Sequence, residues 1–283
     1  MPEIASGKIA CVLSSGGMRG AYQLGVLKAM EERKMVFDLM VGASVGAMNA
    51  MRYVAEQIDV YMHVWLEHCT GRQLIDPRRA LRLTQRRPVF DLDYMLGDAI
   101  RDHEIDTARI DASPTEVQVA ITAYPSLKTE FKKLTGENVI PLLTATAAMP
   151  YVSGGPVYLE GQRYLDGGLT APVPVQPALE SKCETIYVLC VRSEEEVQAD
   201  ARLGYFQRSL RPFMTPLQKS LIDRRVKRAH IHKALSDDTY QATGKKIVFL
   251  RPNSRLPVGR FTADKACLQK AIDIGYQDAL DRL

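Results

Sequence analysis

The chain has 283 residues, of which 46% are hydrophobic and 25% are charged, and its net charge at pH 7 is +4. This composition is typical of a globular protein with room for one large α/β domain or two smaller ones. So slight an excess of positive charge does not indicate a nucleic-acid-binding protein, and we expect no nucleic-acid partner. We also expect no membrane-spanning helix, because every apolar run is shorter than the ~20 residues that cross a bilayer.

The cysteines and the N-terminal residues bear on the cellular compartment. Five cysteines are scattered through the chain without a CxxC pair or the spacing of a zinc site. Such a set is typical of reduced thiols, and the first 20 residues lack the pattern of a secretory signal. We therefore expect a cytoplasmic protein that contacts membranes at most peripherally. We expect no metal and no cofactor.

The first 60 residues predict two strand–helix units. Residues 8–14 and 38–41 are apolar runs typical of buried strands, and a glycine-containing turn follows each of them. Residues 21–33 and 47–57 then have the spacing of helices. Strands that alternate with helices in this way predict a parallel sheet with helical crossovers.

The remaining elements are less regular. Residues 58–105 have mainly helical patterning, and residues 194–233 form a charged helical stretch that Pro212 and Pro216 interrupt. The chain ends in a predicted helix, residues 263–283. Further strands are predicted at residues 117–124, 129–134, 157–165 (a hairpin turning at Gly161), 185–191 and 246–250.

The stretch VGASVGAMN, residues 41–49, contains a GxSxG pattern. In a nucleophile elbow, glycines two residues before and after the serine relieve crowding where a strand turns sharply into a helix. Gly42, Ser44 and Gly46 have this spacing between a predicted strand and a predicted helix. The alternative is a tight turn in which Ser44 only caps the helix.

The loop SGGMRG, residues 15–20, allows two interpretations. Backbone N–H groups at a helix start can bind a phosphate or can form an oxyanion hole. A dinucleotide loop requires glycine where Ser15 stands and an acid after the second strand, whereas Asp38 precedes that strand. An oxyanion loop beside Ser44 explains more of the pattern. Arg19 then holds the loop, meets an anionic head group, or is simply solvated.

A nucleophilic serine needs a base. None of the histidines (His63, His68, His103, His230 and His232) follows a strand end or lies in a glycine-rich turn. Asp166 ends a predicted strand, and Gly167 and Gly168 allow the backbone to turn tightly after it. Asp166 is therefore the candidate base, although an Asp-Gly-Gly sequence is also a common plain turn.

The motifs GGMRG, GASVG and DGG, in that order, resemble those of the patatin-like phospholipase family, and bacterial members above all. Residues 144–150, 161–169 and 172–175 extend the resemblance, which covers roughly residues 8–195. It implies a three-layer α/β/α sandwich with a mainly parallel central sheet, in a single domain over residues 1–283. Residues 196–283 carry no motif, and we expect them to form either a lid or the completion of the fold.

The resemblance also implies roles for individual residues. Ser44 would be the nucleophile and Asp166 the general base of a dyad without a catalytic histidine. Two departures from the family pattern stand near the site: Ser15 replaces a frequent glycine, and Ala171 replaces a frequent asparagine. The oxyanion hole would be formed by Gly16, Gly17 and Met18, and the supporting motif residues are Arg19, Gly20, Gly42, Gly46, Gly167 and Gly168.

The resulting hypothesis is a serine acyl hydrolase that cleaves acyl esters of phospholipids, lysophospholipids or related lipids through an acyl-serine intermediate. One alternative is an acyltransferase on a related fold, although such enzymes usually use a histidine base. A second is a Ser–Asp–His hydrolase with His230 or His232 as base. A third is an inactive lipid-binding or regulatory protein. The sequence leaves the head group, the acyl chain length and the oligomeric state open.

Two basic stretches could bring the protein to a lipid surface. Residues 77–87 contain five arginines, and residues 208–233 contain many more basic side chains. Such clusters attract anionic lipids, although each also fits the solvated face of a helix. Transient contact with a membrane surface is therefore a hypothesis for both stretches.

Overall fold

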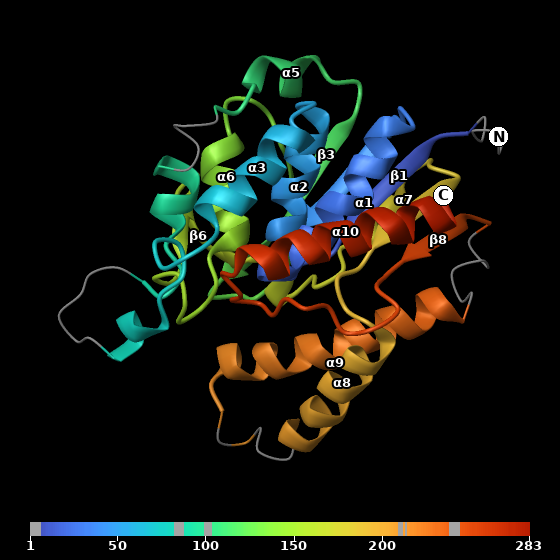
Figure 1. Cartoon of the computed structure of the whole chain (residues 1–283). Helices are drawn as coiled ribbons and strands as arrows, with labels where there is room; N and C mark the ends of the chain where they lie inside the picture. Colours follow the sequence, from blue (N-terminus) through green and yellow to red (C-terminus); the bar gives the residue numbers. More distant parts are fainter. Residues whose placement is uncertain (1–6, 82–87, 99–103, 209–211, 213, 238–243) are drawn as a thin grey trace.

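The computed structural model describes residues 7–81, 88–98, 104–208, 212, 214–237 and 244–283. A central sheet with the strand order β5-β6-β3-β2-β1-β7-β8 runs through the molecule, and β4 pairs with β3 beside this path (Figure 1). The strands are β1 (Ile9–Leu13), β2 (Leu39–Ala43), β3 (Glu116–Tyr124), β4 (Thr129–Lys133), β5 (Val157–Leu159), β6 (Gln162–Asp166), β7 (Thr185–Leu189) and β8 (Lys246–Leu250).

The sheet is mixed, with a parallel centre. Strands β1, β2, β3, β7 and β8 pair in parallel, whereas β4 and β6 each run antiparallel to β3. All the strands predicted from the sequence are present, including the hairpin of β5 and β6 that turns at Gly161. Every residue of the parallel strands β1 and β2 is buried, as expected of strands that helices cover on both faces.

Helices form a layer on each side of the sheet, so the expected three-layer α/β/α arrangement is confirmed. One face is covered by α1 (Gly20–Glu32), α2 (Val45–Val54), α3 (Ile58–His68), α6 (Val139–Ala147) and α10 (Lys265–Arg282). The other face packs against α7 (Gln176–Glu180) and the C-terminal end of α9 (Pro216–Ser236). Five short elements and the longer helix α8 (Glu194–Arg208) complete the described chain. The short elements are η1 (Gly17–Arg19), η2 (Pro77–Leu81), η3 (Tyr94–Asp98), α5 (Thr107–Ala112) and η4 (Gly167–Leu169).

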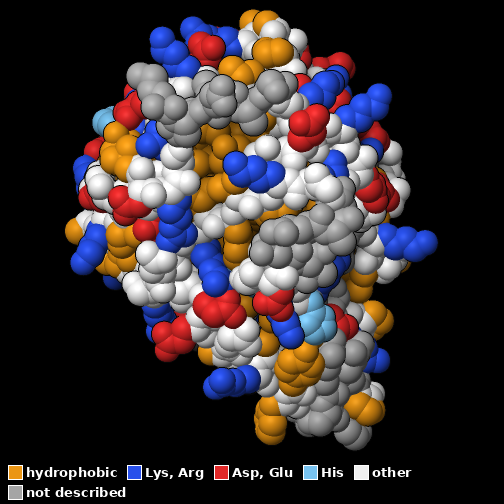
Figure 2. All heavy atoms as spheres, turned by 90° about the vertical axis from the view of Figure 1, so that its right-hand side faces the viewer, with side chains coloured by type: hydrophobic (Ala, Val, Ile, Leu, Met, Phe, Trp, Pro, Cys, Tyr) orange, Lys and Arg blue, Asp and Glu red, His pale blue; other side chains and the backbone are white. Residues whose placement is uncertain are grey.

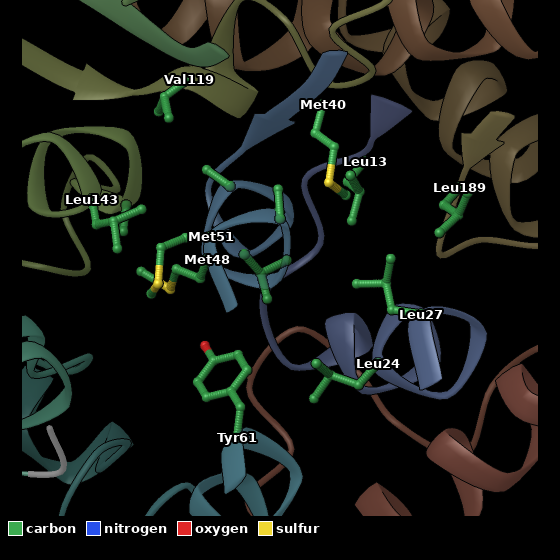
Figure 3. Close-up of a cluster of buried hydrophobic side chains, with 14 of the residues drawn as sticks. Leu13, Leu24, Leu27, Met40, Met48, Met51, Tyr61, Val119, Leu143 and Leu189 are labelled. Carbon is green, nitrogen blue, oxygen red and sulfur yellow. The ribbon is translucent and has the colours of Figure 1, made fainter. Parts of the chain in front are cut away.

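Figure 3 shows the core under the first of these layers. Met48 and Met51 of α2 point toward Leu143 on one side, and the ring of Tyr61 reaches toward the two methionines from α3. All four side chains are buried. This packing fixes α2, the helix that begins immediately after Ser44, against the helices around it.

The prediction of mainly helical structure over residues 58–105 is wrong for much of that stretch. After α3 the described part of this stretch has the short 3-10 turn η2 and a helical turn over residues 92–98 that includes η3, whereas residues 69–76 and 88–91 are irregular. Gly71 has the positive φ of 72°, and Pro77 and Pro88 remove backbone donors, which prevents a continuous helix. Residues 82–87 and 99–103 lie outside the described part.

The region after residue 195, which carries no motif, contributes to the sheet layers. Strand β8 extends the sheet in parallel beside β7, and α10 lies alongside α1 (Figure 1). A methyl group built on Gly25 would lie 1.9 Å from the carbonyl oxygen of Ile272, and one on Gly275 would lie 2.0 Å from that of Tyr22. Glycine at these two positions therefore allows α1 and α10 to cross in close contact.

Helices α8 and α9 form a hairpin that projects from the body of the molecule (Figure 1). The break predicted between them is confirmed: Thr215 caps α9 with its side chain, and Pro216 takes the first helical position. Figure 2 shows charges of both signs intermixed over one face, with hydrophobic side chains at the lower end where the hairpin projects. No helix in the described residues is long and apolar enough to span a membrane.

Candidate active site

Ser44 occupies a strained turn between β2 and α2. Its φ of 55° and ψ of −126° lie outside the conformations that most residues adopt. A methyl group built on Gly42 would lie 2.5 Å from Cα of Ala47, and one built on Gly46 would lie 2.4 Å from the carbonyl oxygen of Leu13. The two glycines of GxSxG are therefore required by backbone contacts, as a nucleophile elbow predicts.

Thr146 stabilises this turn from α6. Its hydroxyl accepts the backbone N–H of Ser44 at 2.9 Å and donates to the carbonyl oxygen of Ala120 at 2.6 Å. The three residues belong to α6, the serine turn and β3, so one buried hydroxyl ties these elements together. The sequence placed Thr146 in a stretch similar to the family but assigned it no role, because a threonine in an apolar segment is usually a packing residue.

The register of the sheet brings Asp166 to Ser44. Ala120 of β3 pairs with Ala43 at the end of β2, and the next residue, Ile121, pairs with Asp166 at the end of β6. Strand β4 pairs with both Ala120 and Ile121, so it occupies the opposite side of β3. Strands β2 and β6 therefore meet end to end on one side of β3, and their last residues adjoin.

The two side chains are in contact. The Ser44 hydroxyl donates to Oδ2 of Asp166 at 2.9 Å, and the Gly168 N–H donates to Oδ1 of the same carboxylate at 2.6 Å. Ser44 is 7% exposed and Asp166 is 5% exposed. Methyl groups built on Gly167 and Gly168 would clash with Ala120 and with Asp166 itself, so the turn after Asp166 requires both glycines.

The environment adjusts the basicity of Asp166. Burial raises the pKa of this carboxyl above its ordinary range, because the charged form loses hydration. The positive charge of Arg224, the N–H of Gly168, the Ser44 hydroxyl and the charge of Arg260 each lower the pKa in part. The balance leaves a carboxylate that is more basic than an ordinary aspartate.

The loop of Gly16, Gly17 and Met18 lies beside Ser44 at the end of β1. Gly17 has the positive φ of 61°, and no hydrogen bond is recorded for the N–H groups of Gly16 and Gly17 within the described residues. The N–H of Met18 instead donates to the carbonyl oxygen of Arg260 at 3.1 Å. Two of the three predicted oxyanion donors are thus unoccupied, whereas the third is used by the segment that precedes α10.

The structure shows the contacts that Ser15 and Ala171, the two departures from the family pattern, make near the site. Ser15 donates its N–H to the carbonyl oxygen of Pro172 at 3.0 Å and its hydroxyl to the same oxygen at 3.3 Å. It therefore fastens the glycine loop to the chain that follows Asp166. Ala171 is buried, its N–H donates to the carbonyl oxygen of Gly167, and it packs in one cluster with Ala43 and Ala120.

Two of the supporting motif residues lie around the loop. Arg19 is buried and forms an ion pair with Glu196 of α8 at 3.2 Å, so it is not the solvated side chain that one interpretation expected. Gly20 packs against α2, where a methyl group would lie 2.3 Å from Cγ2 of Val45. Both residues help to join η1 and α1 to the elements that surround Ser44.

The candidate histidine bases lie elsewhere. The ring of His230 is hydrogen-bonded to the Tyr205 hydroxyl at 2.9 Å, and His232 is buried against the ring of Phe249. The Ser44 hydroxyl is hydrogen-bonded to Asp166. The geometry therefore favours a carboxylate over either histidine as the partner of Ser44.

An apolar cavity opens next to Ser44. It has an empty volume of about 410 Å³ and is lined by Ser44 and Met18 at one end and by hydrophobic side chains beyond them. These side chains include Met48, Tyr61 and Trp65, of which Met48 and Tyr61 are visible in Figure 3. A cavity of this lining accepts a hydrocarbon chain. The described residues contain no cluster of His, Cys, Asp and Glu side chains that would hold a metal ion.

Comparison with known proteins identifies the family of the chain. The profile of the patatin-like phospholipases matches residues 11–179, and the chain belongs to this family. The resemblance predicted from the three motifs is thereby confirmed.

Individual relatives cover only parts of the chain. The uncharacterized protein YjjU of Escherichia coli K12 is 29% identical over 187 residues, which are 65% of this chain and 52% of YjjU. An uncharacterized NTE family protein of Mycobacterium tuberculosis H37Rv is 28% identical over 180 residues, 61% of this chain and 46% of that protein. The chain thus spans about half the length of these curated relatives. The solved structure of VipD from Legionella pneumophila aligns with 98% of this chain and 66% of its own, at 13% identity and a TM-score of 0.47.

Replacing Thr146 by Val should destabilise the serine turn. The substitution keeps the shape of the side chain but leaves the buried N–H of Ser44 without a partner, which costs about 1–3 kcal/mol. Urea unfolding should show this loss of stability, together with a lower esterase activity. Thr144→Val is the matched control, since the Thr144 hydroxyl bonds only to Ile140 within the same helix. Equal stability of the two variants would contradict the role assigned to Thr146.

Replacing Gly17 by Ala should impair the glycine loop. The positive φ disfavours a side chain by about 1–2 kcal/mol, and the new methyl group would also lie 2.6 Å from the carbonyl oxygen of Arg260. We expect kcat to fall by about 10²-fold or more, the size of effect seen when one oxyanion donor is lost.

Gly161→Ala is the control for Gly17→Ala. Gly161 has a similar φ of 77°, and a methyl group there would have no neighbour within 4 Å. This variant should lose a little thermal stability and retain its esterase rate. Equal rates in both variants would show that the loop geometry at Gly17 does not matter for the reaction.

Proposed function

We propose that the protein is a serine acyl hydrolase that cleaves acyl esters of phospholipids, lysophospholipids or related lipids. The observation that carries this proposal is the hydrogen bond of 2.9 Å from the hydroxyl of Ser44 to Asp166, in a strained turn beside an apolar cavity. Membership of the patatin-like phospholipase family supports it. A matching protein of Mycosarcoma maydis, 25% identical over 201 residues and covered to 10% of its length, bears the name lysophospholipase NTE1.

Ser44 is the proposed nucleophile and Asp166 the proposed general base. As the serine oxygen attacks the ester carbonyl, its proton passes to Oδ2 of Asp166 along the existing hydrogen bond. The raised pKa of the buried carboxyl makes it a better proton acceptor than an exposed aspartate. The N–H of Gly168 holds the other carboxylate oxygen, so the receiving oxygen stays aimed at Ser44.

The tetrahedral intermediate carries a negative charge on the former carbonyl oxygen. The backbone N–H groups of Gly16 and Gly17 are the proposed donors to this oxygen. The N–H of Met18 could join them only after its hydrogen bond to Arg260 opens. Collapse of the intermediate expels the alcohol, which takes the proton from Asp166. The acyl chain then remains on Ser44, with its tail in the apolar cavity.

Deacylation repeats the same steps with water. Asp166 accepts a proton from the water molecule as its oxygen attacks the acyl-serine carbonyl, and the donors of the glycine loop again meet the oxyanion. The serine oxygen leaves with the proton and returns to its starting state. Both half-reactions need a single carboxylate that alternates between base and acid, which fits a site without a histidine next to Ser44.

Labelling with a fluorophosphonate probe tests the dyad. Ser44→Ala should abolish labelling, and Asp166→Asn should slow it by about 10²–10⁴-fold, the usual contribution of a general base. The double variant His230→Ala/His232→Ala should retain labelling and hydrolysis of a short-chain ester. Loss of labelling in the histidine variant, with the dyad variants unaffected, would move the proposal to a different catalytic apparatus.

Contact with a lipid surface is a second part of the proposal. Of the two basic stretches, the described part of residues 77–87 includes Arg78 and Arg79, which pair with Asp76 and Asp91. In the second stretch, Arg228 is buried and Lys227 donates to the carbonyl oxygen of Thr170, so both cations already contact other parts of the protein. We therefore propose that contact also uses the hydrophobic side chains that α8 exposes, such as Phe206, which is 73% exposed.

Flotation with anionic vesicles tests this contact. Phe206→Ser should lower the vesicle-bound fraction several-fold at low salt, because a buried aromatic ring contributes about 2–3 kcal/mol to partition into an apolar phase. Val36→Ser is the control, since Val36 is 64% exposed but lies in the connection between α1 and β2. Absence of wild-type protein from the vesicle fraction would contradict the membrane-surface proposal.

A further inference from the structure

Five arginines cluster around the end of the sheet where Ser44 and Asp166 meet. They come from four separate parts of the chain: η1, the residues after β7, helix α9 and the segment before α10. Burial and the neighbouring guanidinium groups lower the pKa of Arg260 to about 9 and that of Arg228 well below its ordinary value. The members of this arginine cluster are Arg19, Arg192, Arg224, Arg228 and Arg260.

Three members of the arginine cluster have carboxylate partners. Arg19 pairs with Glu196 at 3.2 Å. Arg192 and Arg228 both pair with Asp200, at 2.9 Å and 3.5 Å. These pairs join the α8–α9 hairpin to the sheet edge, and they account for the positions of three guanidinium groups.

Arg224 and Arg260 have no such partner within the described residues. Neither guanidinium group forms a side-chain hydrogen bond or an ion pair there, and Nε of Arg224 is buried without a partner. Both charges act on Asp166, yet the two oxygens of that carboxylate are bonded to Ser44 and Gly168. Leaving two guanidinium groups unpaired in a partly desolvated site is unfavourable, and an anionic ligand would remove that cost.

The position of Arg260 connects the arginine cluster to the reacting atoms. A methyl group built on Gly17 would lie 2.6 Å from the carbonyl oxygen of Arg260 and 2.8 Å from its Cγ. The side chain of Arg260 therefore begins in contact with the glycine loop that is proposed to bind the oxyanion. The charge of Arg260 also acts on Asp166, the hydrogen-bond partner of Ser44, so its guanidinium lies on the side of the loop where the ester would bind.

We propose that Arg224 and Arg260 bind the phosphate group of the substrate, and that the preferred substrates are acyl esters carrying a terminal phosphate monoester. This inference rests on the proposed hydrolase function and specifies its head group. The apolar cavity on the α2 and α3 side receives the acyl chain, and the arginine cluster on the α9 side receives the phosphate. The ester between the two ends of the substrate is thereby presented to Ser44.

The charge balance favours a monoester over a diester. Against the five guanidinium groups stand the carboxylates of Glu196, Asp200 and Asp166, which leaves two positive charges without a counterpart in the described site. A phosphate monoester carries about −1.5 to −2 charges at neutral pH and matches this excess. A phosphocholine head group carries one negative charge and would bring a further cation toward the arginines. Guanidinium groups also bind phosphate oxygens with paired hydrogen bonds.

The test uses three substrates with one acyl chain in common: a lysophosphatidic acid, the matching lysophosphatidylcholine and the uncharged monoacylglycerol. Wild-type kcat/KM should be highest for the lysophosphatidic acid. Arg224→Gln and Arg260→Gln should each lower this value by about 10–100-fold, as expected for a hydrogen-bonded charge pair. Because both charges also act on Asp166, kcat/KM for the monoacylglycerol serves as the reference: it reports any effect on the base, and it should fall far less than the value for the lysophosphatidic acid. Circular dichroism and thermal unfolding show whether the variants are folded.

Two further variants serve as controls. Arg224→Lys keeps the positive charge and should recover part of the preference for the phosphate substrate, although it loses the paired hydrogen bonds. Lys233→Gln removes a positive charge from the exposed side of the same helix, about 13 Å further along α9, and should leave all three rates unchanged. Equal losses on all three substrates in Arg224→Gln and Arg260→Gln, or no wild-type preference for the phosphate monoester, would overturn the proposal.

A binding measurement separates this inference from the hydrolase proposal. Calorimetry with the inactive Ser44→Ala variant should show binding of glycerol 3-phosphate, and adding Arg224→Gln should weaken it at least tenfold. Binding without any wild-type ester hydrolysis would retain the phosphate site and refute the hydrolase. Ester hydrolysis without such binding would refute the phosphate site alone. Binding of inorganic phosphate as tight as that of glycerol 3-phosphate would overturn the head-group assignment in favour of a free phosphate ligand.

Discussion

The end-to-end meeting of β2 and β6 on one side of β3 is the constraint on which the site depends. It makes Ala43 and Asp166 neighbours through the adjacent residues Ala120 and Ile121 of β3. Both strands must end there, and the segment that follows each strand must turn out of the sheet immediately. Gly42, Gly46 and Gly167 are required because each turn runs against backbone atoms that leave no room for a side chain, and Gly168 is required because the side chains of Ser15 and Asp166 fill that space. The contact between Ser44 and Asp166 follows from this register.

Burying a carboxylate at this junction is costly, and the surrounding residues offset the cost in a way that suits the proposed reaction. Hydrogen bonds from Ser44 and Gly168 stabilise the charged form, and the charges of Arg224 and Arg260 act from a greater distance. The arginines do not hydrogen-bond to Asp166, so their charges lower its pKa in part while its oxygens stay bonded to Ser44 and Gly168. The same arginines remain able to bind an anion, so one arrangement serves both the base and the proposed phosphate site.

The C-terminal third of the chain connects the catalytic core to this arrangement. Strand β8 and α10 extend the sheet and its helical layer, and the close crossing of α1 and α10 fixes the helix that follows the glycine loop. The segment between them brings the carbonyl oxygen of Arg260 to the N–H of Met18. The basic stretch of α9 is turned largely inward, where Arg228 is buried and Lys227 donates to the carbonyl oxygen of Thr170. Residues 196–283 therefore complete the fold through β8 and α10, and a role of α8 and α9 as a lid stays a prediction.

The sequence by itself determined the strands and most helices. Apolar runs, glycine turns and a helix start marked by a capping threonine and a proline are all local features. It also pointed to Ser44 and Asp166, which the structure brings into hydrogen-bonding contact, because each lies in a short motif that backbone crowding makes recognisable. It failed over residues 69–76 and 88–91, where Gly71 and the prolines interrupt the helical spacing. Only the tertiary structure decided that Thr146 holds the serine turn, that Arg260 covers the glycine loop and that Arg224 faces Asp166. Those pairs of residues are more than 50 positions apart in the sequence, and their contact depends on how the helices pack, which no local pattern encodes.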